Sequence, residues 1–66
     1  MKAATLQKKL ARLEKSIDNM ERGMYADMTP AMCVDCIVWL WQYRYIDHAT
    51  MVNLSDRMTE LFKYYL

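Results

Sequence analysis

Apolar residues recur every three or four positions through the first third of the chain, from Leu6 to Met24. This spacing is typical of an amphipathic helix with one narrow apolar seam, because three or four residues complete about one helical turn. Gly23 is the only glycine in the sequence, and glycine readily adopts the left-handed conformation that ends a helix. We therefore predict a first helix over about residues 3–23. Its seam consists of Leu6, Leu10, Leu13, Ile17, Met20 and Met24.

A second segment, residues 30–46, is apolar on nearly every side of a helix. Thr29 and Pro30 are a start signal, because the Thr hydroxyl can accept a hydrogen bond from a free amide group and proline fits the first helical position. The alternating aromatic residues from Trp39 to Tyr45 also fit a β-strand. We predict a helix over about residues 30–46, since the segment is too long for a typical strand and the sequence offers no partner strand.

A third amphipathic segment follows Asp47, which can cap a helix, while Ile46 is placed to pack against Met51 as a hydrophobic staple. Apolar residues again step by three or four, which predicts a helix over about residues 48–64. Two seam-bearing helices thus flank a central apolar one. Short connections favour antiparallel neighbours, so we predict an all-α bundle of three helices that forms one domain, residues 1–66.

The composition indicates that part of the apolar surface of this bundle must be buried against another protein chain. The chain has 66 residues and is 55% hydrophobic, and one core in so short a chain supplies only roughly 3 to 5 kcal/mol of stability. Aromatic side chains of the central helix point to at least two sides, so the other two helices leave some of them exposed to solvent. Exposed apolar area of this kind marks an interface. We therefore expect oligomerisation, in the form of a homodimer, or a stable complex with another protein.

Charge and hydropathy exclude several classes of protein. Nine Lys and Arg against eight Asp and Glu leave a net charge of +1, far from the strongly basic balance of most nucleic-acid-binding proteins. The longest apolar run, Cys36 to Trp41, has six residues, whereas a membrane span needs about 20. No apolar stretch follows the basic start, so we expect no secretory signal and a cytoplasmic location.

Cys33 and Cys36 form a CxxC pair near the start of the second predicted helix. Redox sites with this spacing stand on a βαβ framework that the pattern lacks, so we favour simple core packing of the two thiols. His48 could add a third metal ligand, but a structural zinc site needs four; a dimer sharing zinc through Cys33 and Cys36 remains an alternative. We expect no cofactor, and no catalytic motif accompanies His48, so we expect no enzymatic activity.

A basic cluster near the start of the chain raises weak nucleic-acid binding as another alternative. Such a cluster can touch phosphates with salt-sensitive affinity. The second and third helices also fit a helix-turn-helix, although the outer face of the third predicted helix is neutral overall. The expected phosphate contacts are Lys2, Lys8, Lys9 and Arg12.

Several short pairs are spread along the chain: Arg12-Leu13, Ile17-Asp18, Glu21-Arg22, Asp47-His48, Asp56-Arg57 and Phe62-Lys63. Together with Tyr43, they resemble positions of the Hha and YmoA family of nucleoid-associated modulators, small helical proteins that bind another DNA-binding protein. The resemblance implies a helical transcription modulator. The family lacks the aromatic second helix, so its partner-binding residues are not transferred to this chain.

The patterns together favour a non-enzymatic, protein-binding regulator or inhibitor of the adaptor type, which acts by covering a partner's surface. A phage- or plasmid-encoded inhibitor of a host or defence complex fits this profile. Aromatic residues and arginine dominate the energetics of protein interfaces. We therefore expect partner-binding residues at Trp39, Trp41, Tyr43, Arg44 and Tyr45, with rim contacts from Tyr64 and Tyr65.

Overall fold

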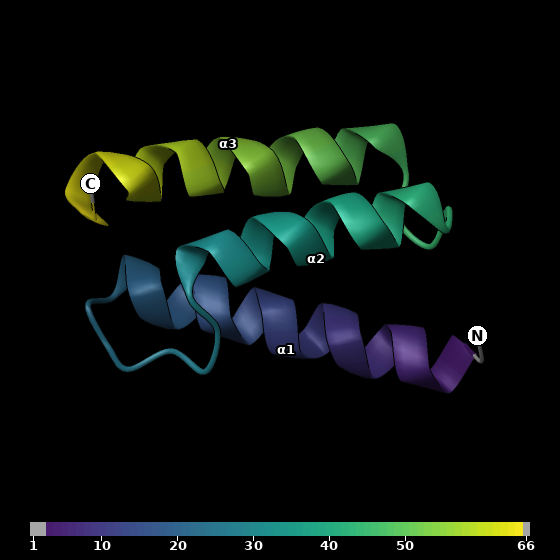
Figure 1. Cartoon of the computed structure of the whole chain (residues 1–66), viewed down its shortest axis with the longest axis horizontal. Helices are drawn as coiled ribbons and strands as arrows, with labels where there is room; N and C mark the ends of the chain where they lie inside the picture. The colour runs from purple at the N-terminus through teal and green to yellow at the C-terminus, as the bar shows by residue number, and fades with distance from the viewer. Residues whose placement is uncertain (1–2, 66) are drawn as a thin grey trace.

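The computed structural model describes residues 3–65, and of Tyr65 it describes only the backbone. Three helices follow one another: α1 (Ala3–Glu21), α2 (Pro30–Gln42) and α3 (His48–Tyr65). Successive helices run antiparallel, and α2 lies between α1 and α3 (Figure 1). The described part of the chain contains no strand. The prediction of an all-α, three-helix fold is therefore confirmed.

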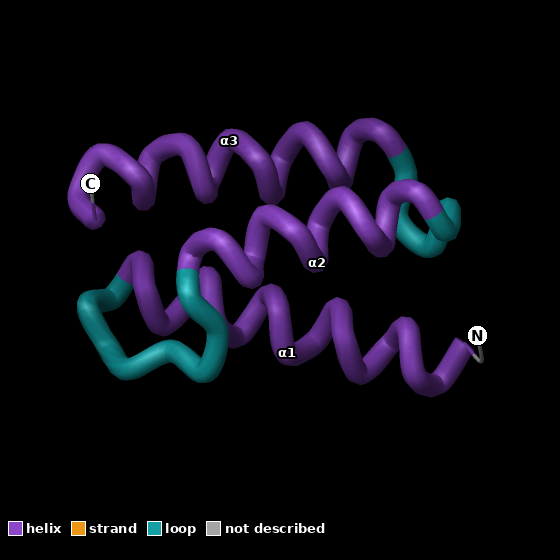
Figure 2. The backbone as a smooth tube through the Cα atoms, viewed as in Figure 1, coloured by secondary structure: helices purple, strands orange, loops and turns teal. Residues whose placement is uncertain are grey.

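Two connections of unequal length join the helices at opposite ends of the bundle (Figure 2). Residues 22–29 form the longer loop and residues 43–47 the shorter turn. The turn lies at the same end as the start of α1. The Cα trace extends over 33 × 21 × 15 Å. Each helix contacts both of the others, so the three helices form a small bundle.

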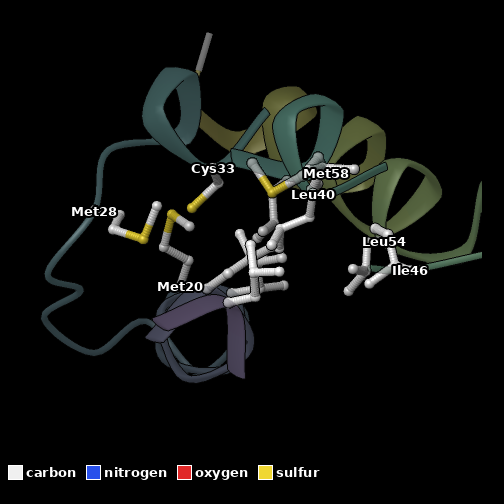
Figure 3. Packing of buried hydrophobic residues seen from close by; sticks show 12 residues of the cluster. Met20, Met28, Cys33, Leu40, Ile46, Leu54 and Met58 are labelled. Atoms are coloured by element: carbon white, nitrogen blue, oxygen red, sulfur yellow. The ribbon is translucent and has the colours of Figure 1, made fainter. Parts of the chain in front are cut away.

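The hydrophobic core is built from the inner faces of all three helices (Figure 3). Within each helix these residues are spaced by three, four or seven positions, which places them on one face. The predicted seam of α1 is buried or half-buried from Leu6 to Met20, whereas Met24 lies beyond the helix and is exposed. The largest fully buried side chains are Leu13 and Ile17 from α1, Ile37 and Leu40 from α2, and Met58 from α3.

Gly23 closes α1, as the sequence predicts. Its φ is 69°, and its N–H donates to the carbonyl of Met20 at 3.2 Å, while the N–H of Met24 donates to the carbonyl of Asn19 at 2.7 Å. These two bonds form a Schellman motif, the common closure of a helix by a left-handed residue. The helix itself ends at Glu21, slightly before the predicted boundary, because the closing turn takes up the last residues.

The starts of α2 and α3 are capped by the two predicted residues. The hydroxyl of Thr29 accepts a hydrogen bond from the N–H of Met32 at 3.2 Å, and Pro30 is the first residue of the helix. The Asp47 carboxylate accepts a hydrogen bond from the N–H of Thr50 at 2.7 Å. Hydrogen bonding to the side chain of Thr50, together with the bond to its backbone N–H, lowers the pKa of the Asp47 carboxyl.

The end of α2 differs from the prediction, since the helix stops at Gln42 rather than near residue 46. Arg44 has a φ of 59° and donates its N–H to the carbonyl of Trp41 at 2.9 Å. The N–H of Tyr45 donates to the carbonyl of Leu40 at 3.0 Å. These bonds repeat the Schellman motif with an arginine at the left-handed position. Because glycine usually occupies that position, the sequence carries no stop signal there.

Arg57 of α3 bridges to α1 through two carboxylates. Its Nη2 lies 2.8 Å from Oδ1 of Asp18, and its Nε lies 3.0 Å from Oε2 of Glu21. The i,i+4 spacing favours a pair between Asp18 and Arg22 within α1, but Asp18 binds the arginine of the neighbouring helix instead. Hydrogen bonding to Arg57 lowers the pKa of the Glu21 carboxyl.

Replacing Arg57 with Met should lower the free energy of unfolding by roughly 0.5 to 1 kcal/mol at pH 7, because the partly exposed carboxylates of Asp18 and Glu21 lose their partner. A carboxyl with a depressed pKa in the folded state stabilises the fold above its unfolded pKa. That contribution is lost as the pH falls through the folded pKa. The difference between wild type and variant should therefore shrink below about pH 4.

Urea unfolding at pH 7 and at pH 3 measures this difference. Lys63→Met is the matched control, because the ion pair between Lys63 and Glu60 is exposed and lies within α3; we expect it to cost less than about 0.5 kcal/mol. A loss for Arg57→Met that stays equally large at both pH values would contradict the assignment of this bridge to ion pairing.

Candidate protein-docking site

A cleft of about 1000 Å³ lies beside the turn between α2 and α3 and is open to solvent. One wall comes from α1, and the others come from the end of α2, the turn and the start of α3. Figure 1 shows the turn and the start of α1 at the same end of the bundle. The lining residues are Leu10, Glu14, Trp41, Gln42, Arg44, Tyr45, Ile46, Asp47 and Thr50.

Three of the predicted partner-binding residues meet in this cleft: Trp41, Arg44 and Tyr45. The side chain of Trp41 is 42% exposed, and its ring lies beside that of His48, with 6.3 Å between the ring centroids. Tyr45 is half-buried and packs against the core. The left-handed turn at Arg44 places these side chains together, because it reverses the chain directly after α2.

Two other predicted residues lie away from the cleft: Trp39 on a different side of α2, and Tyr43 directly after the end of that helix. Their ring centroids are 4.5 Å apart, and Nζ of Lys9 lies 5.0 Å from the centroid of a Trp39 ring, within the range of a cation–π interaction. Side chains two positions apart on a helix point about 200° apart. Trp39 and Trp41 therefore belong to two separate surfaces.

The predicted rim contacts lie away from the cleft. Tyr64 is 84% exposed, but it stands near the end of α3, which Figure 1 shows at the opposite end of the bundle from the turn. The side chain of Tyr65 lies outside what the structure describes. The structure thus gives the cleft no rim contact from the end of α3.

Sequence patterns did not indicate the contribution of α1 to the cleft. Leu10 belongs to the seam that the spacing assigns to the core, yet it is only half-buried. Glu14 lies one turn further along α1 and is exposed. Glu14 and Asp47 carry negative charge and Arg44 positive charge, so the cleft combines an apolar centre with charged edges. That arrangement is typical of protein interfaces.

The basic residues predicted to contact phosphates do not form one free patch. Lys2 lies outside the described residues. Nε of Arg12 donates to a carboxylate oxygen of Asp27 at 3.2 Å. The ammonium group of Lys9 lies over the ring of Trp39 in a cation–π contact. Of the described basic residues in this group, Lys8 is exposed without such a contact.

The structure separates the possible metal ligands. Cys33 is fully buried, and burial raises the pKa of its thiol to about 11, so the thiol is protonated near neutral pH. His48 lies beside Trp41, which is about 12 Å further along α2 from Cys33. No group of three or more His, Cys, Asp and Glu within residues 3–65 is placed to hold a metal ion. A zinc site shared between two chains would require the buried Cys33 to reach the surface.

Comparisons with protein-family models, with curated proteins and with solved structures find no match for this chain. In the part of the chain that the structure describes, no helix has both the length and the apolar character to cross a bilayer. The functional assignment therefore rests on the residues themselves and on their arrangement.

Proposed function

We propose that this chain is a small, non-enzymatic, protein-binding regulator or inhibitor that docks a partner protein in the cleft beside the turn. The observation that carries this proposal is the position of Trp41, which remains 42% exposed at the wall of an open cleft. A tryptophan next to a tyrosine and an arginine is the combination most often found at the energetic centres of protein interfaces. Binding there would cover part of the partner's surface.

The shape and charge of the cleft indicate the kind of partner. Pockets for small molecules enclose most of the ligand surface, whereas this cleft is broad and open. Its edges carry Glu14 and Asp47 against a single Arg44. We therefore expect a polypeptide segment with an apolar anchor, flanked by basic side chains, as the occupant.

Other features of the chain agree with a binding role in the cytoplasm. Among the described side chains, Ser16 is the one buried polar group, and His48 is exposed beside a tryptophan rather than beside a nucleophile. In the cytoplasm, cysteines such as Cys33 and Cys36 are kept as thiols.

Trp41→Ala should weaken binding to the partner by at least about fivefold, which corresponds to more than about 1 kcal/mol. The partner would first be captured from a lysate with the purified chain and identified, and its affinity for each variant would then be measured by calorimetry. Tyr25→Ala is the matched control, because Tyr25 is an aromatic residue that is 86% exposed in the loop before α2. Its removal should leave the affinity unchanged.

Two results would count against the proposal. Equal affinities of the Trp41→Ala and Tyr25→Ala chains would show that the cleft is not the docking site. Failure of the purified chain to capture any protein from a lysate of the cells in which it naturally occurs would contradict the regulatory role itself. Circular dichroism of both variants confirms that the helices are retained before affinities are compared.

A further inference from the structure

The face of α2 that points away from the core forms a second seam, most of which the neighbouring helices leave exposed. Its positions also repeat at intervals of three and four residues, so α2 is apolar on two faces and needs cover on both. Met32 and Val38 on this face are exposed, and Trp39 is half-buried. We call this face the outer row; it consists of Ala31, Met32, Asp35, Val38, Trp39 and Gln42.

Two opposite charges lie at the outer row, and both lack ionic partners among the described residues. Asp35 is exposed in the middle of the row, and its carboxylate forms no ion pair with any other described residue. Lys9 reaches the row from α1, with its Nζ 5.0 Å from the centroid of a Trp39 ring, and it too lacks a carboxylate partner among the described residues. Asp35 and Trp39 are about 6 Å apart along the helix axis.

We propose that the outer row binds the outer row of a second copy of this chain, with the two α2 helices antiparallel about a two-fold axis at the level of Ile37. In this register, Asp35 of each copy lies opposite Trp39 of the other copy. The carboxylate of Asp35 then lies beside the ammonium group of Lys9 of the other copy, which covers the Trp39 ring of that same copy. Two-fold symmetry forms this pair twice.

The same two charges disfavour the parallel arrangement. In a parallel, in-register pair, Asp35 would face Asp35 and Lys9 would face Lys9, and like charges at an interface disfavour that pairing. The antiparallel register also places Met32 opposite Gln42 of the other copy, where the methylene groups of the glutamine cover the methionine side chain. The charges of Asp35 and Lys9 therefore favour the antiparallel orientation of the two copies.

The dimer should be weak. A contact between two helices of 13 residues each is smaller than the interfaces of about 1,200 to 2,000 Å² that stable complexes bury. We expect a dissociation constant on the order of 10 to 100 μM. Gln42 belongs to both the outer row and the docking cleft, whereas Trp41 points to another side of α2 and belongs to the cleft alone, so variants of Trp41 test the cleft without changing the outer row.

Sedimentation equilibrium of the full chain, from about 5 μM to about 1 mM, tests the proposal. Asp35→Lys alone and Lys9→Glu alone each place like charges opposite one another in both pairs, and each should weaken the dimer at least about tenfold. The double variant restores opposite charges and should return to within about threefold of the wild-type dissociation constant. Lys8→Glu is the matched control, because it makes the same change of charge at a neighbouring exposed lysine; it should shift the constant by less than about threefold.

Three results would overturn the proposal: a wild-type chain that stays monomeric at about 1 mM, single variants that behave like Lys8→Glu, or a double variant as weak as the single ones. None of them bears on the docking cleft. Trp41→Ala keeps the outer row intact, so a Trp41→Ala chain that dimerises normally but fails to bind the partner protein would separate the two surfaces.

Discussion

Leu40→Ala should lower the free energy of unfolding by about 2 to 5 kcal/mol. Leu40 is fully buried and lies on α2, the helix that packs against both α1 and α3. Removing its side chain leaves a cavity that the helices cannot close without shifting. A core in a chain of this length supplies only roughly 3 to 5 kcal/mol, so we expect the variant to be largely unfolded at 25 °C.

Urea unfolding followed by circular dichroism measures the effect, with added sucrose to bring the variant into a measurable range. Val52→Ala is the matched control, because Val52 lies on the exposed side of α3 and its truncation should cost less than about 0.5 kcal/mol. A loss below about 1 kcal/mol for Leu40→Ala would mean that α2 is not the centre of the core.

The helix boundaries show which parts of this fold can be predicted from local sequence. Gly23, Thr29 and Asp47 each act on backbone groups within a few residues of themselves, so their roles follow from residue type and position. The end of α2 could not be predicted in this way. It depends on Arg44 in a left-handed conformation, which an arginine adopts only when the surrounding contacts require it.

Contacts between helices explain the other differences. Arg57 pairs with Asp18 and Glu21, which are more than 35 positions away in the sequence. Spacing rules concern residues on the same helix, so this bridge carries no signal in the sequence. The wall that Leu10 and Glu14 contribute to the cleft could not be predicted from the sequence for the same reason.

The residue types of the candidate site could be predicted from the sequence, whereas the surface to which each residue belongs could not. The sequence indicates only that the aromatic side chains of this helix point to at least two sides. The structure divides them, since Trp41 lines the cleft while Trp39 contacts Tyr43 and Lys9. The expected helix through residue 46 also assigns wrong directions after Gln42, because the chain turns there. Each surface therefore has to be tested with its own variants.

Arg44→Gly should stabilise the fold and weaken partner binding at the same time. An L-residue at a φ of 59° costs roughly 1 kcal/mol relative to glycine, so the variant should gain about that amount in the free energy of unfolding. The same change removes the guanidinium group from the edge of the cleft. We expect the affinity for the partner to fall at least about fivefold, because arginine is among the residue types that contribute most to the energetics of protein interfaces.

Gly23→Ala is the matched control for the backbone effect, because Gly23 holds the same position in the motif that closes α1 and has a φ of 69°. A Cβ there would meet no atom within 4 Å, so the expected loss of about 1 kcal/mol comes from the backbone conformation alone. Partner binding should not change, since Gly23 lies at the other end of α1 from the cleft.

Urea unfolding and calorimetry on the same samples separate the two effects of Arg44→Gly. A variant that is more stable but binds weakly would mean that the arginine is kept for recognition in a position where the fold alone favours glycine. A variant that is less stable than wild type would instead mean that the Arg44 side chain holds the turn together, and the cleft would then be a consequence of folding rather than a docking site.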